Sequence, residues 1–138
     1  MTNKETVRTF IEKVLNQYQF DELDKFVSLK FQTHSLHLNP IPPIAGSNPL
    51  SFKEALIQSQ KVLENFNRKI EEIFESGNKV VVRHTTSAIH IGEFMGIPAS
   101  NKKISFAGIS IYEVSEGKIT DEWYVWDRLG LYQQLGML

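Results

Sequence analysis

The chain has 138 residues, a length that predicts a single domain over residues 1–138 with enough buried surface for a core. It contains no cysteine, which excludes disulfides and thiolate zinc sites and fits a reducing compartment, so a cytoplasmic protein is expected. With a formal net charge of −1 and no clustered basic residues, no nucleic-acid partner is expected. No apolar run approaches the ~20 residues that cross a bilayer, so no membrane partner is expected either.

Helical patterns occupy the first half of the chain. Apolar residues recur at helical intervals over residues 3–18, after a threonine and a glutamate at capping-box spacing. Asp21 is placed to cap a short second helix that runs to Phe26 or Leu29. A second capping box precedes a third helical pattern over residues 52–66. Because the pattern over residues 3–18 is that of a helix, the N-terminal residues begin a helix and lack the apolar stretch of a signal peptide.

Between the second and third helical patterns, the segment from Phe31 to Leu50 is rich in proline and is expected to be a loop. A loop of this length is unusual in a compact domain, and it often forms a lid or a pocket wall.

Strand patterns rich in Val, Ile, Thr and aromatic residues fill the second half of the chain. Short Gly-containing turns join them, which predicts an antiparallel sheet. Three helices followed by such a sheet indicate an α+β fold, with the helices on one face and a ligand cavity at the open end of the curved sheet. The expected strands cover residues 70–74, 79–91, 103–114 and 118–126.

Four side chains are candidates for moving a proton, and each has an alternative role. Asp127 follows the last strand and could act as a general acid/base or cap the segment after it. Asp121 could be a pocket carboxylate or an ion-pair partner of Arg83. His34 could stand at a cavity mouth or on the surface. His90 could point into the cavity or be a hydrogen-bonded histidine at the sheet edge.

Large aromatic residues are interleaved with carboxylates on the last strand, which suggests a pocket for a flat or apolar ligand, with ordinary core packing as the alternative. Strand alternation separates two sets of side chains but cannot say which set faces the cavity. Of the four histidines, His34 and His37 are three residues apart but have no clear third ligand, so no metal is expected. The glycines form no phosphate cradle, so no other cofactor is expected either.

Four motifs lie along the second half of the chain. Together they resemble those of the SnoaL-like polyketide cyclase family, in its ester cyclase branch. This family is part of the nuclear-transport-factor-2-like superfamily. The resemblance implies a cone, with a strongly curved antiparallel sheet around an internal pocket and about three N-terminal helices closing one side. It also implies a homodimer and chemistry without a cofactor. The motifs are Arg83-His84-Thr85, His90 to Pro98, Gly117 to Trp123 and Asp127 to Gly136.

Family members that close an aromatic polyketide ring use an aspartate to move the proton and a histidine on the neighbouring strand. By this resemblance Tyr124 stands at the aspartate position and Ser110 at the histidine position, while Asp127 matches a second aspartate. A tyrosine cannot act as the base at neutral pH, because its unperturbed pKa is near 10. The candidate substrate-binding residues are Arg83, Ser110, Tyr112, Trp123 and Tyr124.

The sequence leaves three functions open. The chain could be a cofactor-free cyclase or isomerase that acts on a small apolar or aromatic carbonyl compound. It could instead bind such a ligand without catalysis, or serve as a dimerisation module. A homodimer through the outer face of the sheet is expected, because apolar residues occupy both sides of the strands and the helices cover only one.

Overall fold

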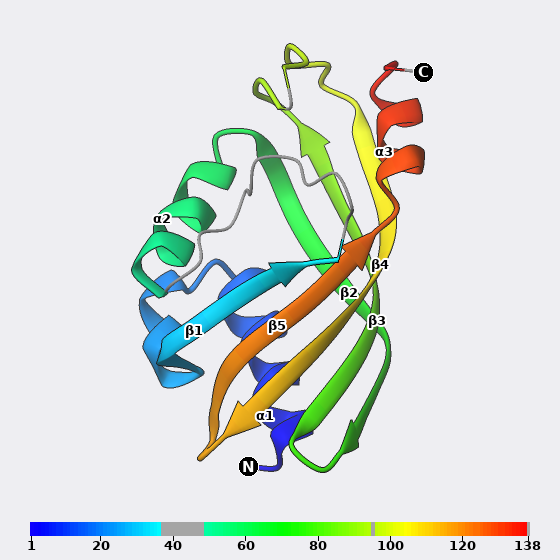
Figure 1. Cartoon of the computed structure of the whole chain (residues 1–138). Helices are drawn as coiled ribbons and strands as arrows, with labels where there is room; N and C mark the ends of the chain where they lie inside the picture. The colour runs from blue at the N-terminus through cyan, green and yellow to red at the C-terminus, as the bar shows by residue number, and fades with distance from the viewer. Residues whose placement is uncertain (37–48, 95, 138) are drawn as a thin grey trace.

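The structure, a computed structural model, describes residues 1–36, 49–94 and 96–137, and in this part of the chain five strands form a sheet in the order β1-β5-β4-β3-β2 (Figure 1). Strands β2 to β5 pair with antiparallel neighbours, whereas β1 pairs with β5 in parallel. The strands are β1 Val27–Ser35, β2 Leu63–Ser76, β3 Lys79–His90, β4 Lys103–Ser115 and β5 Lys118–Trp126.

The sheet is curved, and irregularities in strand register contribute to the bend. In β2 the register shifts between Glu64 and Asn67, where Asn65 has a left-handed φ of 55°, and again between Ile70 and Glu72. Extra residues of this kind bend a strand and increase its twist. The result is a concave face, which confirms the curved α+β architecture.

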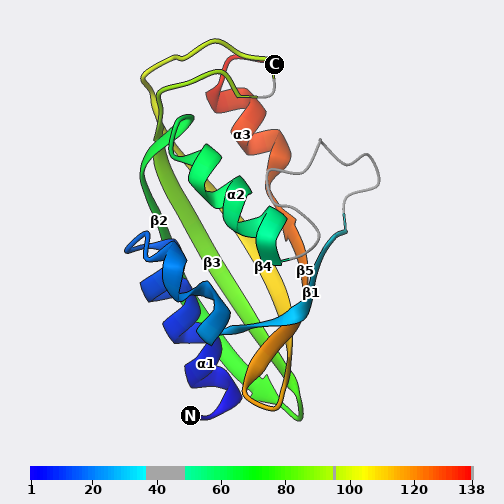
Figure 2. The same cartoon turned by 90° about the vertical axis from the view of Figure 1, so that its left-hand side faces the viewer.

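Helices cover the concave face (Figure 2). Helix α1 lies toward the end that carries the strand turns, and α2 lies toward the opposite end, while the two termini are at opposite ends of the molecule. In the described part of the chain no helix has the length and apolarity needed to cross a bilayer. The helical elements are α1 Asn3–Thr9, a π-helical continuation Phe10–Leu15, a 3₁₀ turn Phe20–Lys25, α2 Pro49–Ser59 and α3 Arg128–Gln134.

Two buried hydrophobic clusters fill the space between helices and sheet. The first packs α1 and its π-helical continuation against the end of the sheet near the turns, and it includes Val80 and Val82 of β3. The second lies toward α3 and includes Ala88 of the same strand. Between them β3 carries two buried polar residues, His84 and Thr86. A polar band therefore crosses the concave face between the two clusters.

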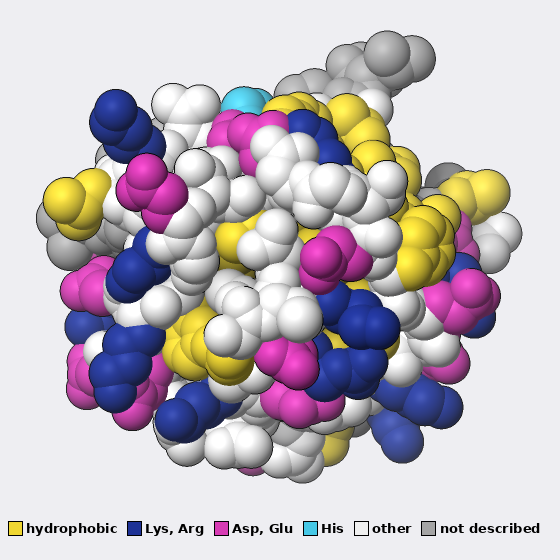
Figure 3. Space-filling view, turned by 90° about the horizontal axis from the view of Figure 1, so that it is seen from below, with side chains coloured by type: hydrophobic (Ala, Val, Ile, Leu, Met, Phe, Trp, Pro, Cys, Tyr) yellow, Lys and Arg dark blue, Asp and Glu magenta, His cyan; other side chains and the backbone are white. Residues whose placement is uncertain are grey.

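The end of the molecule near the strand turns has a mixed charged surface (Figure 3). Lysine and arginine side chains lie among aspartates and glutamates, so this face carries no single sign of charge. Exposed ion pairs such as Arg8 with Glu12, 4.0 Å apart, contribute about 0–1 kcal/mol to stability.

Two expectations about the first half of the chain are wrong. The segment from Phe31 to Leu50 was expected to be a loop, but its first residues belong to β1, while residues 37–48 lie outside the described part. The register of β1 shifts between Val27 and Gln32, so burial does not alternate along this strand and the period of a strand is lost. Because β1 is also parallel to β5, the sheet is mixed and not wholly antiparallel.

The helix expected over residues 52–66 is also too long. Helix α2 ends at Ser59, and β2 begins at Leu63. Leu63 and Phe66 are three residues apart, as on one helix face, but they both reach the concave side because the bulge between them adds a residue to the strand. A β-bulge here imitates the period of a helix.

We predict that the first hydrophobic cluster depends on β1. Phe31 is fully buried and packs edge-to-face on Phe52 of α2 at a centroid distance of 5.2 Å. The Phe31→Ala substitution should lower the free energy of unfolding by about 3–5 kcal/mol in urea titrations. The control, Leu29→Ala on the same strand, should change it by less than about 0.5 kcal/mol, because Leu29 is 90% exposed. Equal effects of both substitutions would mean that β1 is not packed in this way.

Candidate active site

A chain of hydrogen bonds joins three buried polar side chains across β3, β4 and β5. Ser110 Oγ donates to Glu122 Oε2 at 3.0 Å, and His84 Nε2 lies 3.1 Å from Ser110 Oγ. The three residues are only 1–6% exposed. We call His84, Ser110 and Glu122 the polar triad. It lies in the band between the two hydrophobic clusters.

The register of the sheet and one glycine bring the triad together. Alternation turns all three side chains to the concave face. In the β3–β4 register His84 is opposite Gly108, two residues before Ser110. A Cβ atom at Gly108 would lie 2.6 Å from Cε1 of His84. The missing side chain of Gly108 therefore leaves the space in which the His84 ring reaches toward Ser110.

The carboxyl group of Glu122 is in an unusual electrostatic environment. Burial raises the pKa of Glu122, while the positive charge of Arg68 and the hydrogen bond from Ser110 oppose the rise. Arg68 is fixed through its Nε, which donates to Thr86 Oγ1 at 3.0 Å. The Tyr112 hydroxyl also lies beside Glu122 and helps to lower its pKa, although no described group meets that hydroxyl at full hydrogen-bond geometry. Burial is the largest effect, so Glu122 holds its proton more tightly than an exposed glutamate.

The imidazole of His84 is neutral at neutral pH. Burial lowers the pKa of His84 to about 3, and the positive charge of Arg68 lowers it further in the same direction. Its Nε2 is engaged by Ser110. Its Nδ1 is buried and has no hydrogen-bond partner among the described residues.

Two tyrosines border the triad. Burial and the nearby Glu122 raise the pKa values of both Tyr112 and Tyr124, so both keep their phenolic protons at neutral pH. In the register of the strands Tyr124 is opposite Ser110, and Tyr112 is opposite Glu122. Both hydroxyls can therefore act as neutral hydrogen-bond donors on the concave face.

Asp127 lies outside this group. Its side chain is at the exposed start of α3, where Oδ1 accepts a hydrogen bond from the Gly130 amide at 2.9 Å. This is the capping role that the sequence left open as the alternative to acid/base chemistry.

Asp121 and His34 lie together, but on the outer face of the sheet. His34 Nε2 is 2.9 Å from Asp121 Oδ2, and the His34 ring stacks on Trp123 at 5.0 Å. Because side chains alternate along β5, these residues point away from Glu122. Arg83 is also exposed, and it binds Glu72 at 2.8 Å, not Asp121.

His90 is fully buried at the far end of β3. Its Nδ1 is 2.8 Å from Ser100 Oγ, and its ring packs edge-to-face on Phe94. It lies six residues beyond His84 on the same strand and takes no part in the triad. His90 is thus both buried in the interior and hydrogen-bonded, on a strand that has neighbours on both sides, and its Nε2 has no partner among the described residues.

Of the candidates named from the sequence, the structure brings together Ser110, Tyr112 and Tyr124. It adds Glu122 and His84, which were not singled out. Both have the same strand parity as the three predicted residues, and this is the signal that could have found them once the cavity face of the sheet was known.

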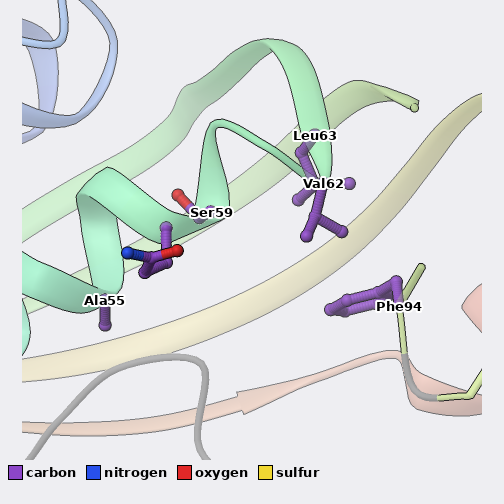
Figure 4. Close-up of a pocket in the computed structure, with 6 residues that line it drawn as sticks. Ala55, Ser59, Val62, Leu63 and Phe94 are labelled. Atoms are coloured by element: carbon purple, nitrogen blue, oxygen red, sulfur yellow. The ribbon is translucent and has the colours of Figure 1, made fainter. Parts of the chain in front are cut away.

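The described residues also form a mainly apolar pocket of about 160 Å³ near the second hydrophobic cluster (Figure 4). It lies between the end of α2, the start of β2 and Phe94, away from the triad, and contains none of the expected aromatic or acidic residues. The residues that line this pocket are Ala55, Gln58, Ser59, Val62, Leu63 and Phe94.

No group of His, Asp and Glu in the described part could hold a metal ion.

Comparisons with known proteins agree with the resemblance read from the sequence. The family model described as SnoaL-like polyketide cyclase matches residues 5–135. The aklanonic acid methyl ester cyclase DnrD of Streptomyces peucetius is 28% identical over 137 residues, which are 98% of this chain and 91% of that protein.

Solved structures extend the similarity to the fold. A crystal structure from Acidithiobacillus ferrooxidans has a TM-score of 0.85 and 26% identity, covering 99% of this chain and 96% of that one. TsrD from Streptomyces laurentii has a TM-score of 0.82 and 25% identity, covering 97% of this chain and 94% of that one.

The raised pKa of Glu122 predicts a pH-dependent difference in stability between the protein and its Glu122→Gln variant. The folded state keeps a proton that the unfolded state releases near its ordinary pKa of 4.5. The contribution of Glu122 is therefore complete below that pH and is lost as the pH rises through the folded pKa.

The measurement is urea unfolding of both proteins between about pH 4 and pH 8. The stability of the wild type relative to Glu122→Gln should fall with rising pH, with a slope of at most about 1.4 kcal/mol per pH unit. The opposite effect of His84 is present in both proteins and cancels in the difference. A difference that stays constant across this range would show that Glu122 titrates normally.

Proposed function

Because the chain belongs to the SnoaL-like polyketide cyclase family, we propose that it binds a small apolar or aromatic carbonyl compound on the concave face of its sheet. There it catalyses a cyclisation or isomerisation by proton transfer, without a cofactor. One observation carries the proposal: a carboxyl group, that of Glu122, is buried on this face with a raised pKa and a hydrogen bond from Ser110.

Such a reaction begins with removal of a proton next to a carbonyl group. It needs a base near the carbon and a donor near the oxygen that gains negative charge. A carboxylate with a raised pKa is a stronger base than an ordinary glutamate, and its pKa lies closer to the working pH. The protonated Tyr124, at the position of the family aspartate, supplies a donor for the enolate oxygen. A donor thus stands where the family pattern has its base, and the proposed base stands two residues earlier on β5.

Glu122 replaces Asp127 as the proposed proton carrier because of where the two carboxylates lie. Asp127 is exposed and engaged in capping α3, so its environment resembles that of a surface aspartate. Asp121 is paired with His34 on the opposite face of the sheet. Neither position gives the desolvated environment that this chemistry requires.

The test measures proton exchange, which requires no knowledge of the final product. We expect the protein to accelerate deuterium uptake next to the carbonyl group of tetralone or of aryl β-keto esters in heavy water, followed by proton NMR. Glu122→Gln should reduce the rate about 10²–10⁴-fold, because it removes the titrating group and keeps the shape. Glu113→Gln is the matched control, since Glu113 pairs with Lys79 on the outer face.

Other results would redirect the proposal. Loss of exchange in Asp127→Asn or Asp121→Asn, with full activity in Glu122→Gln, would assign the proton transfer to the outer carboxylates. Binding of tetralone or of an aryl β-keto ester without deuterium exchange would favour a non-catalytic binding domain. Neither binding nor exchange, in a folded dimer, would favour a dimerisation module.

We further propose that the protein is a cytoplasmic homodimer formed through the outer face of the sheet. Ile109 and Val125 are cross-strand partners there, 45% and 39% exposed. Light scattering at micromolar concentration should give twice the mass of the 15.8 kDa chain. Ile109→Glu should give the monomer, whereas Leu129→Glu, which changes an exposed leucine of α3, should not. A monomeric wild type would refute this assembly.

A further inference from the structure

We propose that His84 Nδ1 is the atom that exchanges the proton with the substrate, and that Ser110 passes this proton between His84 and Glu122. This inference rests on the proposed function and deepens it, because it separates the group that stores the proton from the group that touches the substrate. It assigns a catalytic role to His84, which stands at neither of the two catalytic positions implied by the family resemblance.

The position of Glu122 suggests that it needs an intermediary. Its side chain is only 6% exposed and lies in register with Tyr112, which is fully buried in the first hydrophobic cluster. Ser110 and His84 occupy successive positions toward the second cluster. The contacts from Glu122 Oε2 through Ser110 Oγ to His84 Nε2, 3.0 and 3.1 Å long, lead away from the first cluster along the polar band.

The far end of that chain is an unsatisfied polar atom. His84 is 2% exposed, and its Nδ1 has no partner among the described residues. Leaving a buried polar group unpaired destabilises the folded state, so a persistent one calls for an explanation. Gly108 adds a second sign of adaptation, since any side chain there would collide with the His84 ring. A substrate atom that meets Nδ1 would satisfy this nitrogen.

The hydroxyl of Ser110 couples the protonation of Glu122 to the tautomer of His84. A hydroxyl donates one hydrogen bond at a time. When Glu122 is ionised, Ser110 donates to it and accepts from His84 Nε2–H, which leaves Nδ1 bare and ready to accept a proton. When Glu122 is protonated, it donates to Ser110, Ser110 donates to Nε2, and the imidazole proton is on Nδ1.

Proton abstraction then balances as follows. The C–H bond of the substrate breaks, its electron pair stays on the substrate as the enolate, and the proton forms a bond to His84 Nδ1. The Nε2 proton moves to Ser110 Oγ, and the hydroxyl proton of Ser110 moves to Glu122. The reverse transfers protonate a product carbon.

The imidazole stays formally neutral before and after the transfer. This agrees with the low pKa of His84, since a separate imidazolium state is not required. The charged and titratable groups that face His84 and Glu122 are Arg68 from β2, Tyr112 from β4 and Tyr124 from β5. Arg68 stabilises the carboxylate and disfavours a charged imidazole, while the tyrosines keep their protons.

The test follows the two ring nitrogens of His84 by NMR in full-length protein labelled at histidine and glutamate, without substrate. The His84 signals are assigned with a His84→Gln variant. As the carboxyl signal of Glu122 shifts on losing its proton, the hydrogen should move from Nδ1 to Nε2 with the same midpoint. In Ser110→Ala the tautomer should no longer follow Glu122, and in the control Ser105→Ala, an exposed serine on β4, it should.

The same protein preparations are then measured for deuterium exchange with tetralone. His84→Gln should lose about as much activity as Glu122→Gln, roughly 10²–10⁴-fold. A His84 tautomer that is fixed while Glu122 titrates, or full exchange by His84→Gln, overturns the relay. If exchange remains dependent on Glu122 in that case, the proposed function stands without it. A coupled tautomer with no exchange of any carbonyl compound overturns the function instead.

Discussion

A carboxyl group buried between two hydrophobic clusters is the constraint on which this site depends. Taking an ionised carboxylate out of water costs several kcal/mol unless charges and hydrogen bonds compensate. Around Glu122 the compensation is partial: Ser110 donates a hydrogen bond and Arg68 supplies a positive charge, yet the pKa remains raised. The fold thus holds a group whose protonation responds to small changes in its surroundings, as acid/base catalysis requires.

The sheet makes this placement possible. Its curvature and the helices on its concave face create an interior in which β3, β4 and β5 each contribute one member of the triad. Hydrophobic packing on both sides of the polar band excludes water from it. We propose that Glu122, two residues before Tyr124 on β5, and His84 on β3 supply the carboxylate and the imidazole that the family resemblance places at Tyr124 and Ser110.

The sequence predicted some elements well for physical reasons. Strand β5 has the expected bounds, 118–126, and β3 and β4 end within one residue of expectation, because β-branched residues and glycine turns define regular antiparallel strands. Strand β1 and the start of β2 were missed, because register shifts in both break the alternation that identifies a strand. A parallel edge strand also gives no hairpin turn as a local signal.

The residues of the site likewise divide into those that the sequence predicted and those that it did not. Ser110, Tyr112 and Tyr124 were named from the sequence and lie together, since they share one parity of adjacent strands. His84 and Glu122 share that parity, but which parity faces the interior depends on how the helices close over the sheet. Local sequence does not carry this information. The pattern of carboxylates beside aromatic residues predicted a role for Asp121 and Asp127. The structure places Asp121 on the outer face of the sheet and Asp127 at the cap of α3.

We propose that the chemistry occurs on the concave face, at the triad. The most direct test is a crystal structure of the protein soaked with tetralone. We expect the ligand between the two hydrophobic clusters, with the carbon next to its carbonyl group against His84 Nδ1 and its oxygen about 2.6–3.2 Å from a tyrosine hydroxyl. A ligand bound instead beside His34 and Trp123 on the outer face, with an unoccupied concave side, would contradict it.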